Sequence, residues 1–289
     1  MNSLISKIGK RLLSTITRVS PKLNAELLFF IRTKKVPNLK KPKSFNEKTT
    51  FLKLYNYNQD VFIPKLVDKY EVRKYVEDKG FKESLNEIYG VYDNFDEIDF
   101  DKLPKKFAIK CTHGCAYNII CSDKSKLNIE AAKNKINYWL NEKYGLATCE
   151  LQYTKIKPRI IIEKYLCDDN GIMPKDYKFY CMNGHVKCIL VCSERESKLK
   201  LSYYDTNWKR VKYEKEKWSS LVDIEKPKNL KMMIDMAEKL SGKYPFVRVD
   251  FYNDNGDIIF GELTFTPACS CAPYYNDQSN ELLGDMLKI

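Results

Sequence analysis

The stretch from Tyr244 to Ala272 constrains this chain most, because it places acidic residues inside apolar strands. Apolar and polar residues alternate over 246–252, and a polar turn around Asn255 separates them from a second apolar run. This pattern predicts a β-hairpin with Asp250 in its first strand and Glu262 near the end of its second. A buried carboxylate must be paired, protonated or bound to a cation. The hairpin therefore predicts a Mg²⁺ site, and a hairpin edge whose acids face water is the alternative.

The length and the cysteine usage limit the class of protein. A chain of 289 residues can form one large or two modest domains, and it contains no apolar run of 18 residues, so we expect no transmembrane span. Its ten cysteines are scattered and no cleavable signal peptide is evident, which predicts reduced thiols and a cytoplasmic protein. With two histidines and no CxxC…CxxC set, a structural zinc site has little support.

Most of the net charge of +12 lies at the N-terminus, because residues 1–50 contain twelve Lys or Arg and two Glu. Apolar residues recur at helical spacing from Leu4 to Val19 with basic residues among them, which predicts a basic amphipathic helix. Such a helix can lie on an anionic membrane, so residues 1–20 are a candidate for peripheral membrane contact. Packing of the helix on its own domain is the alternative.

The remaining pattern mixes helices with antiparallel hairpins and predicts an α+β fold. Ser44 and Glu47 form a capping box that begins a helix, and 63–79 is predicted as one further helix. Asp68, Lys69 and Arg73 on that helix could bind a substrate or could belong to a solvated face. The later pattern predicts strands at 88–91, 107–111, 118–121 and 158–166, a hairpin joining 176–181 to 186–191, and helices at 129–143 and 227–241.

Four short motifs follow one another in a defined order. Lys110 ends a strand before the turn at His113 and Gly114, and the strand exit Glu163-Lys164-Tyr165-Leu166 comes next. Asp176 and Lys178 lie in the third motif, and the fourth contains Arg248, Asp250, Glu262 and Thr264. Simpler explanations exist for several of them: the two lysines can extend along apolar surface to reach water, His113 can bond its own backbone, and Glu163 can be an ordinary strand-end acid.

The motifs FAIKCTHG, EKYL, DYKFYCMNG and VRVDFY…GELTFTP resemble those of the TupA-like ATP-grasp family over roughly residues 44–272. The resemblance implies an α+β ATP-grasp fold in which two α+β lobes enclose a nucleotide cleft, preceded by a helical N-terminal region. The expected divisions are a basic segment at 1–43, a helical region at 44–104, a first lobe at 105–170 and a second lobe with the metal site at 171–289.

The resemblance also implies a role for each matching residue, with ATP and Mg²⁺ as cofactors. Lys110, His113, Gly114 and Lys178 would contact the phosphates, Glu163, Lys164 and Leu166 the adenine, and Asp176 the ribose. Asp250, Glu262 and Thr264 would hold Mg²⁺, while Arg248 and Lys178 would act on the transferred group. The chain departs from the family at Cys115-Ala116, at Thr264 and at Ala268-Cys269-Ser270, where the family more often has glycine or asparagine.

The implied activity is a carboxylate-amine ligase that forms an acyl phosphate during synthesis of a bacterial cell-surface polysaccharide or polymer. Its partners would be ATP, small carboxylate and amine substrates or a lipid-linked acidic acceptor, and the inner face of the cell membrane, with no nucleic acid. An ATP-dependent phosphotransferase or a glycosyltransferase of capsule and cell-envelope synthesis is the first alternative. A non-catalytic basic protein that binds polyanions is the second. The sequence leaves the donor, the acceptor and the oligomeric state open.

Overall fold

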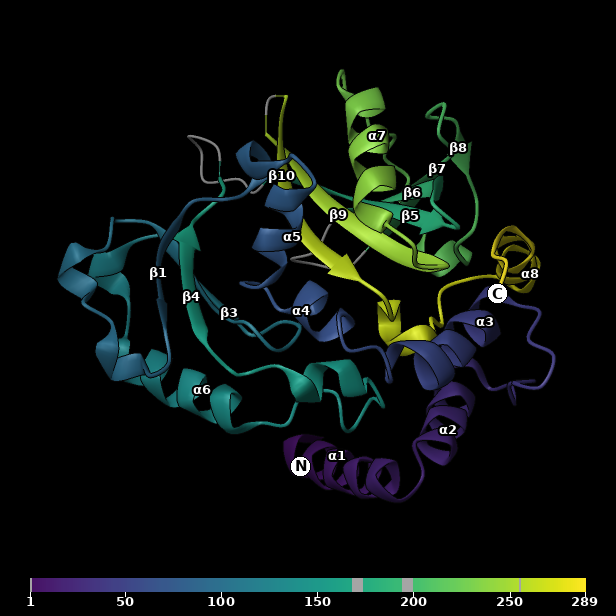
Figure 1. The fold of residues 1–289 in the computed structure, drawn as a ribbon, viewed down its shortest axis with the longest axis horizontal. Helices are drawn as coiled ribbons and strands as arrows, with labels where there is room; N and C mark the ends of the chain where they lie inside the picture. Colours follow the sequence, from purple (N-terminus) through teal and green to yellow (C-terminus); the bar gives the residue numbers. More distant parts are fainter. Residues whose placement is uncertain (1, 168–173, 194–199, 255) are drawn as a thin grey trace. The chain divides into compact units, whose positions relative to one another are not determined.

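The computed structural model describes residues 2–167, 174–193, 200–254 and 256–289, so Asn255 of the predicted turn lies outside the described residues. The chain divides into two units (Figure 1). The first comprises Met1–Asp60, Leu146–Glu150 and Lys175–Ile289, and the second comprises Val61–Gly145 and Leu151–Pro174.

The first unit contains a six-stranded sheet in the order β10-β9-β5-β6-β7-β8, in which every neighbouring pair is antiparallel. Its strands are β5 (Lys175–Met182), β6 (His185–Ser193), β7 (Lys200–Tyr204), β8 (Arg210–Val211), β9 (Phe246–Asp254) and β10 (Asp257–Thr264). Its helices are α1 (Asn2–Val19), α2 (Pro21–Thr33), α3 (Phe45–Leu52), the π-helical turn η1 (Lys53–Tyr57), η7 (Glu216–Trp218), α7 (Leu230–Ser241), η8 (Pro267–Ser270) and α8 (Asp277–Met286). The hairpin predicted around residue 255 is thus β9–β10.

Helix α7 covers one face of this sheet, across β5, β6 and β9 (Figure 1). That face is apolar: Phe179, Val249 and Phe251 are fully buried, and the Cys181 thiol lies 3.5 Å from the carbonyl oxygen of Ala237 in α7. Side chains alternate between the faces of a strand. Lys178, Arg248 and Asp250 therefore project from the opposite face.

The predicted capping box at the start of α3 is confirmed. Ser44 Oγ accepts a hydrogen bond from the backbone N–H of Glu47, and the Glu47 carboxylate accepts from the Ser44 N–H at 3.0 Å. Glu47 also accepts from the backbone N–H groups of Asn38 and Lys43, and these bonds outweigh burial to hold the pKa of its carboxyl below the ordinary value. One acid thus fixes both the helix start and the chain before it.

The second unit contains a four-stranded antiparallel sheet in the order β1-β4-β2-β3. Its strands are β1 (Ile88–Tyr92), β2 (Phe107–Cys111), β3 (Asn118–Cys121) and β4 (Ile160–Lys164). Its helices are α4 (Ile63–Val67), α5 (Val72–Asp78) and α6 (Ile129–Asn141), with short 3₁₀ turns η2 (Lys82–Ser84), η3 (Phe95–Glu97), η4 (Phe100–Lys102), η5 (Lys124–Lys126) and η6 (Leu151–Lys155). Ile136 and Trp139 of α6 share a core with Ile109 and Ile162 of the sheet.

The prediction of one helix over 63–79 is wrong, because α4 ends before Asp68 and α5 begins at Val72. Asp68 adopts an extended backbone conformation after α4. Its Oδ1 accepts hydrogen bonds from the backbone N–H groups of Tyr70 (2.7 Å) and Glu71 (3.1 Å), and its Oδ2 pairs with Arg159 at 3.3 Å. An acid that bonds the backbone ahead of it favours a new helix start over continuation.

Candidate functional site

The first unit brings three of the predicted site residues into line across neighbouring strands. Lys178 of β5 lies opposite Asp250 of β9, and Asp250 lies opposite Glu262 of β10. Arg248 and Thr264 form the adjacent pair on the same face, since they stand two residues away along their strands. The predicted grouping of lysine, arginine and two acids is therefore present in the fold.

A β-bulge at Gly261 creates this alignment. Phe260 pairs with Phe251 while Glu262 pairs with Asp250, so Gly261 is the extra residue on β10. A Cβ atom at position 261 would lie 3.1 Å from the backbone oxygen of Asp250, which is closer than about nine in ten real Cβ contacts. Glycine at this position therefore lets the two strands approach, and the bulge turns Glu262 toward the face that carries Asp250.

Cationic side chains neutralise Asp250, which is 3% exposed. Its Oδ1 accepts a hydrogen bond from Arg248 Nε at 2.7 Å, and its Oδ2 accepts from an Arg248 terminal nitrogen at 2.6 Å and from Lys178 Nζ at 2.5 Å. Burial would raise the pKa of the Asp250 carboxyl, but the charges of Arg248 and Lys178 outweigh it and hold this pKa below its ordinary value. Asp250 is therefore ionised and doubly paired.

The same acids raise the pKa values of the two bases. Burial alone would lower the pKa of Lys178, but Asp250 and Asp176 outweigh it, and Lys178 Nζ lies 2.8 Å from Asp176 Oδ2. Burial likewise opposes protonation of Arg248, yet the Asp250 carboxylate raises the pKa of its guanidinium well above the ordinary value. Both side chains are fixed cations of the kind that bind phosphate groups.

Glu262 is the most exposed member of the group, whereas its neighbour Thr264 is buried. Glu262 Oε1 accepts hydrogen bonds from Arg248 at 3.0 Å and from Thr264 Oγ1 at 2.7 Å, while the Glu262 side chain is 39% exposed. Three acids (Asp176, Asp250, Glu262) face two bases, so the cluster has an excess of negative charge.

This donor set is compatible with Mg²⁺. The hydroxyl and the carboxylates offer only oxygen, which is the ligand atom that Mg²⁺ prefers. Among the residues described, no three His, Cys, Asp or Glu side chains form a group that could hold a metal ion. The two carboxylates would therefore share a magnesium ion with water and phosphate oxygens, as is usual for this ion.

A cavity of about 430 Å³ borders the cluster. Lys178 and Arg248 form its charged side, and the rest is lined by residues that the sequence interpretation missed: Leu190, Cys192, Leu201, Ala268 and Tyr274. Leu190 lies opposite Lys178 because of a bulge between Tyr180 and Cys181, and a hairpin pattern alone carries no signal for that shift. The cavity offers an apolar surface beside two cations.

Three successive residues near this cavity adopt left-handed backbone angles. They are Ala268 (φ 49°), Cys269 (φ 59°) and Ser270 (φ 64°), in the stretch where the family more often has glycine. Their carbonyl oxygens are held by Arg32 (3.1 Å), by the buried ammonium of Lys53 (2.8 Å) and by Thr50 (2.9 Å), respectively. Side chains at φ > 0 cost about 1–2 kcal/mol each, so this turn is maintained by its surroundings.

In the second unit, Lys110 of β2 and Glu163 of β4 form an ion pair of 2.5 Å. Glu163 is buried, and its carboxylate accepts a hydrogen bond from Lys110. The sequence predicted that this carboxylate would accept from the amino group of adenine. The Lys164 N–H donates to the carbonyl of Glu87 at 2.9 Å, and its carbonyl accepts from Asn86 Nδ2 at 2.9 Å. The backbone of Lys164 would have to break these hydrogen bonds before it could bond to adenine. Leu166 lies after the end of β4 and is half-buried.

His113 and Gly114 lie in a tightly packed loop. His113 is 2% exposed, and its Nε2 lies 3.0 Å from the Trp139 carbonyl oxygen, so Nε2 carries the proton and donates. Burial lowers the pKa of the imidazole, which is therefore neutral. A Cβ at Gly114 would lie 2.7 Å from the Tyr117 ring, so only glycine fits there without displacement of the ring. Both residues fix the loop that follows Lys110.

The family model described as TupA-like ATPgrasp matches residues 47–288. None of the curated proteins matches the chain. Similar solved structures include the ADP complex of N5-carboxyaminoimidazole ribonucleotide synthetase, at 12% identity and a TM-score of 0.45, covering 75% of this chain and 47% of that one. D-Alanine–D-alanine ligase from Bacillus anthracis with ATP is 15% identical with a TM-score of 0.42, and the match covers 77% of this chain and 58% of that one. L-amino acid ligase from Bacillus licheniformis is 10% identical with a TM-score of 0.43, and the match covers 75% of this chain and 47% of that one. This chain spans about half the length of these proteins.

The family match covers most of the chain and includes all four motifs on which the resemblance was based, so that prediction is confirmed. The predicted α+β ATP-grasp fold is confirmed with it, and the two antiparallel sheets and the N-terminal helices are as expected. ATP-grasp enzymes use ATP and Mg²⁺, which are the cofactors that the resemblance implied. The chain belongs to the TupA-like ATP-grasp family.

Proposed function

We propose that this protein is an ATP- and Mg²⁺-dependent ligase that joins a carboxylate to an amine. The observation that carries the proposal is the alignment of Lys178, Asp250 and Glu262 across three strands, with Arg248 bound to both acids. Family membership supports it, because the cluster occupies the fourth motif and part of the third.

Each residue of the cluster has a proposed task. Asp250, Glu262 and Thr264 would hold Mg²⁺, which when bound supplies positive charge to the phosphate oxygens. Lys178 would bind a phosphate group, and Asp176, at 2.8 Å, keeps its ammonium in place. Arg248 would present its guanidinium to the transferred phosphoryl group or to the oxyanion formed when the amine attacks. In the second unit, Lys110 would contact phosphate, and the strand exit at Glu163–Leu166 would contact the base.

The proposed substrates are acidic precursors of a bacterial cell-surface polysaccharide or polymer. The family resemblance and the basic N-terminal region support this choice, because a positive surface attracts acidic ligands. The cavity beside Lys178 and Arg248 could receive the organic part of such a substrate on its apolar side.

The test is incubation of the full chain with Mg-ATP and a panel of amino acids and uronic acids, singly and in pairs, with ADP release as the readout. We expect release to rise at least about tenfold only when a carboxylate and an amine are both present, since the amine removes the activated carboxylate. Release that a uronic acid alone stimulates, with no amine present, would indicate a phosphotransferase. Release that no substrate stimulates would contradict the ligase proposal.

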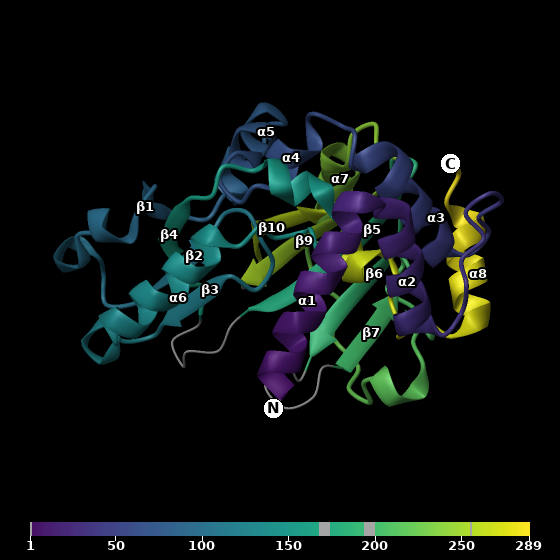
Figure 2. The same cartoon turned by 90° about the horizontal axis from the view of Figure 1, so that it is seen from below.

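We also propose that α1 and α2 bind an anionic lipid surface. Of the residues described, none lies in a helix long and apolar enough to cross a membrane. Ile8, Leu12 and Val19 are 59%, 61% and 83% exposed, and their spacing puts them on one side of α1. Leu23 and Phe30 add exposed apolar area on α2, which packs against α1 (Figure 2).

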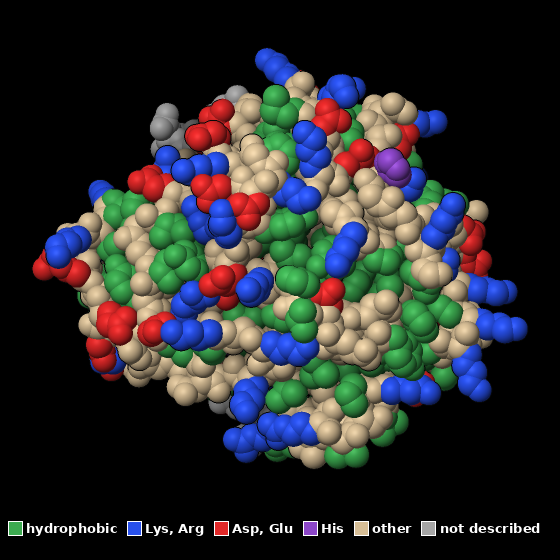
Figure 3. Space-filling model, viewed as in Figure 1, with side chains coloured by type: hydrophobic (Ala, Val, Ile, Leu, Met, Phe, Trp, Pro, Cys, Tyr) green, Lys and Arg blue, Asp and Glu red, His purple; other side chains and the backbone are tan. Residues whose placement is uncertain are grey.

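Two basic residues flank this apolar side, since Arg11 and Arg18 lie beside it by helical spacing and are exposed as well. Figure 3 shows basic and apolar side chains sharing the lower surface, over α1. The inner side of the helix is docked on its own unit, because Thr17 is buried and donates to the carbonyl of Leu146 at 2.7 Å. Both interpretations of the sequence thus have support: one side packs and the other remains open, as in helices that lie on membranes.

The double variant Leu12→Ser/Val19→Ser is expected to lower binding to phosphatidylserine vesicles at least about tenfold, because each change removes exposed apolar area that would enter the lipid. Cosedimentation at two salt concentrations measures it, and binding should also weaken with salt. Leu282→Ser, at an exposed position of α8, is the control and should bind like the wild type. Unchanged binding of the double variant would contradict the proposal.

A further inference from the structure

The segment from Asp68 to Arg73 does not form the solvated helix face that was one interpretation of its sequence. Asp68 is 2% exposed and bonded to Arg159. Lys69 donates its side-chain N–H to the carbonyl of Gly114, and its backbone N–H donates to the carbonyl of Thr112. The segment is therefore attached to its own sheet and loop, and this locates the backbone of Arg73 at the start of α5.

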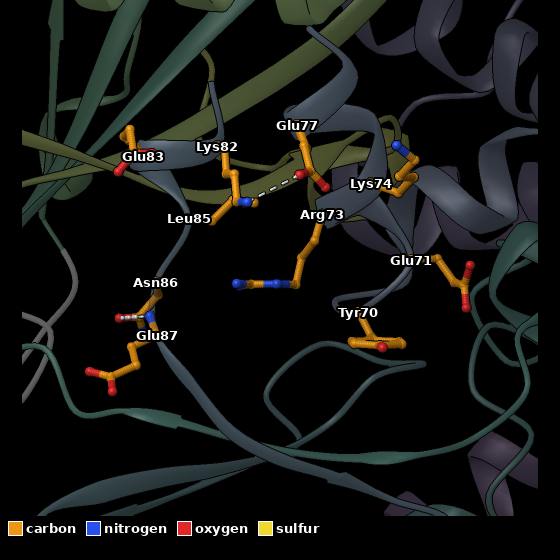
Figure 4. Close-up of a pocket in the computed structure, with 10 residues that line it drawn as sticks. All are labelled: Tyr70, Glu71, Arg73, Lys74, Glu77, Lys82, Glu83, Leu85, Asn86 and Glu87. Atoms are coloured by element: carbon orange, nitrogen blue, oxygen red, sulfur yellow. Dashed lines mark hydrogen bonds and ion pairs between the residues drawn. The ribbon is translucent and has the colours of Figure 1, made fainter. Parts of the chain in front are cut away.

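Arg73 projects into a cavity of about 570 Å³ in the second unit, between α5, η2 and the chain before β1. Figure 4 shows its guanidinium extended into the space between Tyr70 and Asn86. The Tyr70 ring is itself held in place by the Arg159 guanidinium, which lies 4.8 Å from the ring centre. The aromatic wall of the cavity is thus held by a residue of its own unit.

Other charged residues of the lining already have partners. Lys74 pairs with Asp78 at 2.6 Å, Lys82 with Glu77 at 3.5 Å, and Glu71 with Arg159 at 2.7 Å. By contrast, no acceptor among the described residues lies within hydrogen-bond or ion-pair distance of the Arg73 guanidinium.

Arg73 carries its charge in a half-buried place. Burial lowers the pKa of its guanidinium, and the carboxylate of Glu163 counteracts this effect. Glu163 is committed to Lys110 at 2.5 Å, so it acts on Arg73 from a distance and does not bond it. A half-buried guanidinium without a bonded acceptor is unfavourable, and a ligand that supplies two oxygens would remove that cost.

The charges around the opening narrow the choice of ligand. Glu83 and Glu87 are exposed lining residues, and neither is paired with another described side chain. Two acids at the rim repel a polyphosphate or another polyanion. They would instead attract an ammonium group on a ligand whose carboxylate meets the cation at the centre.

We propose that this cavity binds a small zwitterion, of which an α-amino acid is the simplest, with its carboxylate on the Arg73 guanidinium and its ammonium group toward Glu83 and Glu87. The planar fork of arginine matches the two oxygens of a carboxylate. The proposal concerns binding alone and does not require the amino acid to be a substrate of the proposed ligase.

The test is calorimetric titration of the full chain, without nucleotide, with L-alanine, L-lysine and L-phenylalanine. The carboxamides of the same amino acids, propionate and inorganic phosphate serve as comparison probes. We expect at least one amino acid to bind and its carboxamide to bind at least about tenfold more weakly, because a charge-assisted bidentate contact is worth about a factor of ten or more. Propionate, which lacks the ammonium group, should also bind more weakly.

Arg73→Gln should weaken binding of the amino acid at least about tenfold. Arg73→Lys should retain only part of the affinity, because lysine cannot form the bidentate contact. Lys74→Gln is the matched control: it removes a positive charge from the same helix and the same cavity, but from a side chain that is already paired, and should bind like the wild type. Circular dichroism melts verify that the variants are folded. Absence of amino-acid binding, equal binding of the carboxamide, tighter binding of phosphate, or equal losses in the two glutamine variants would each overturn the proposal.

Discussion

Replacing Glu262 with glutamine is expected to lower Mg-ATP turnover at least about 100-fold while leaving the fold intact. Glutamine keeps a side-chain oxygen that can accept from Arg248 and Thr264, as Glu262 Oε1 does at 3.0 and 2.7 Å. It removes the negative charge that would hold Mg²⁺. Because the Glu262 side chain is 39% exposed, the free energy of unfolding should change by less than about 1 kcal/mol.

The measurement is ADP release at fixed ATP with Mg²⁺ varied, alongside urea unfolding. Asp257→Asn is the control, since Asp257 is an exposed acid at the other end of the same strand. That variant should retain wild-type turnover. If Glu262→Gln kept more than half of the wild-type rate at every Mg²⁺ concentration, the assignment of Glu262 as a metal ligand would be wrong.

Replacing Asp250 with asparagine is expected to lower the free energy of unfolding by about 3–5 kcal/mol, in addition to any loss of turnover. Asp250 is 3% exposed and accepts from both Arg248 and Lys178 at 2.5–2.7 Å. The amide would leave two buried cations with less than their compensating charge. The structure therefore predicts that the two carboxylates differ: Asp250 supports the fold as well as the site, whereas Glu262 supports mainly the site.

Urea unfolding followed by circular dichroism at neutral pH measures this difference. Asp235→Asn on α7 is the control, because Asp235 is a 53% exposed partner of Lys231 at 3.3 Å, and loss of such a surface pair costs less than about 1 kcal/mol. An Asp250→Asn variant as stable as the control would show that the ion pairs seen here contribute nothing to folding.

Several features of the molecule could be predicted from local sequence. The alternation over 246–252 is sufficient to predict β9, because a two-residue period of apolar side chains specifies a strand. The Ser44–Glu47 capping box specifies the start of α3, because its bonds join residues three apart. The order of the motifs that contain Lys110, Lys178 and Asp250 was sufficient to identify the family, because motif order can be read directly from the sequence.

Other features depended on contacts between distant residues. A regular hairpin with the same turn would pair Gly261 with Asp250, and the Glu262 side chain would then point to the α7 face. The bulge at Gly261 shifts the register by one residue, so that Glu262 pairs with Asp250. The ion pair of Asp68 with Arg159 joins residues that are 91 positions apart. The partner of Glu163 is Lys110, on another strand of its sheet. A local pattern contains no information about such partners.

The sequence by itself determined the β9–β10 hairpin, the start of α3, the family to which the chain belongs, and which acids and bases stand at matching positions of its motifs. Only the tertiary structure decided that Asp250 is neutralised by Arg248 and Lys178 and that Glu262 faces it. It also decided that Arg73 stands half-buried in a cavity, with no bonded acceptor among the residues that the structure describes. The physical reason is that secondary structure follows from side chains a few residues apart, whereas strand register, ion pairing and burial depend on groups that meet only when the sheet has formed.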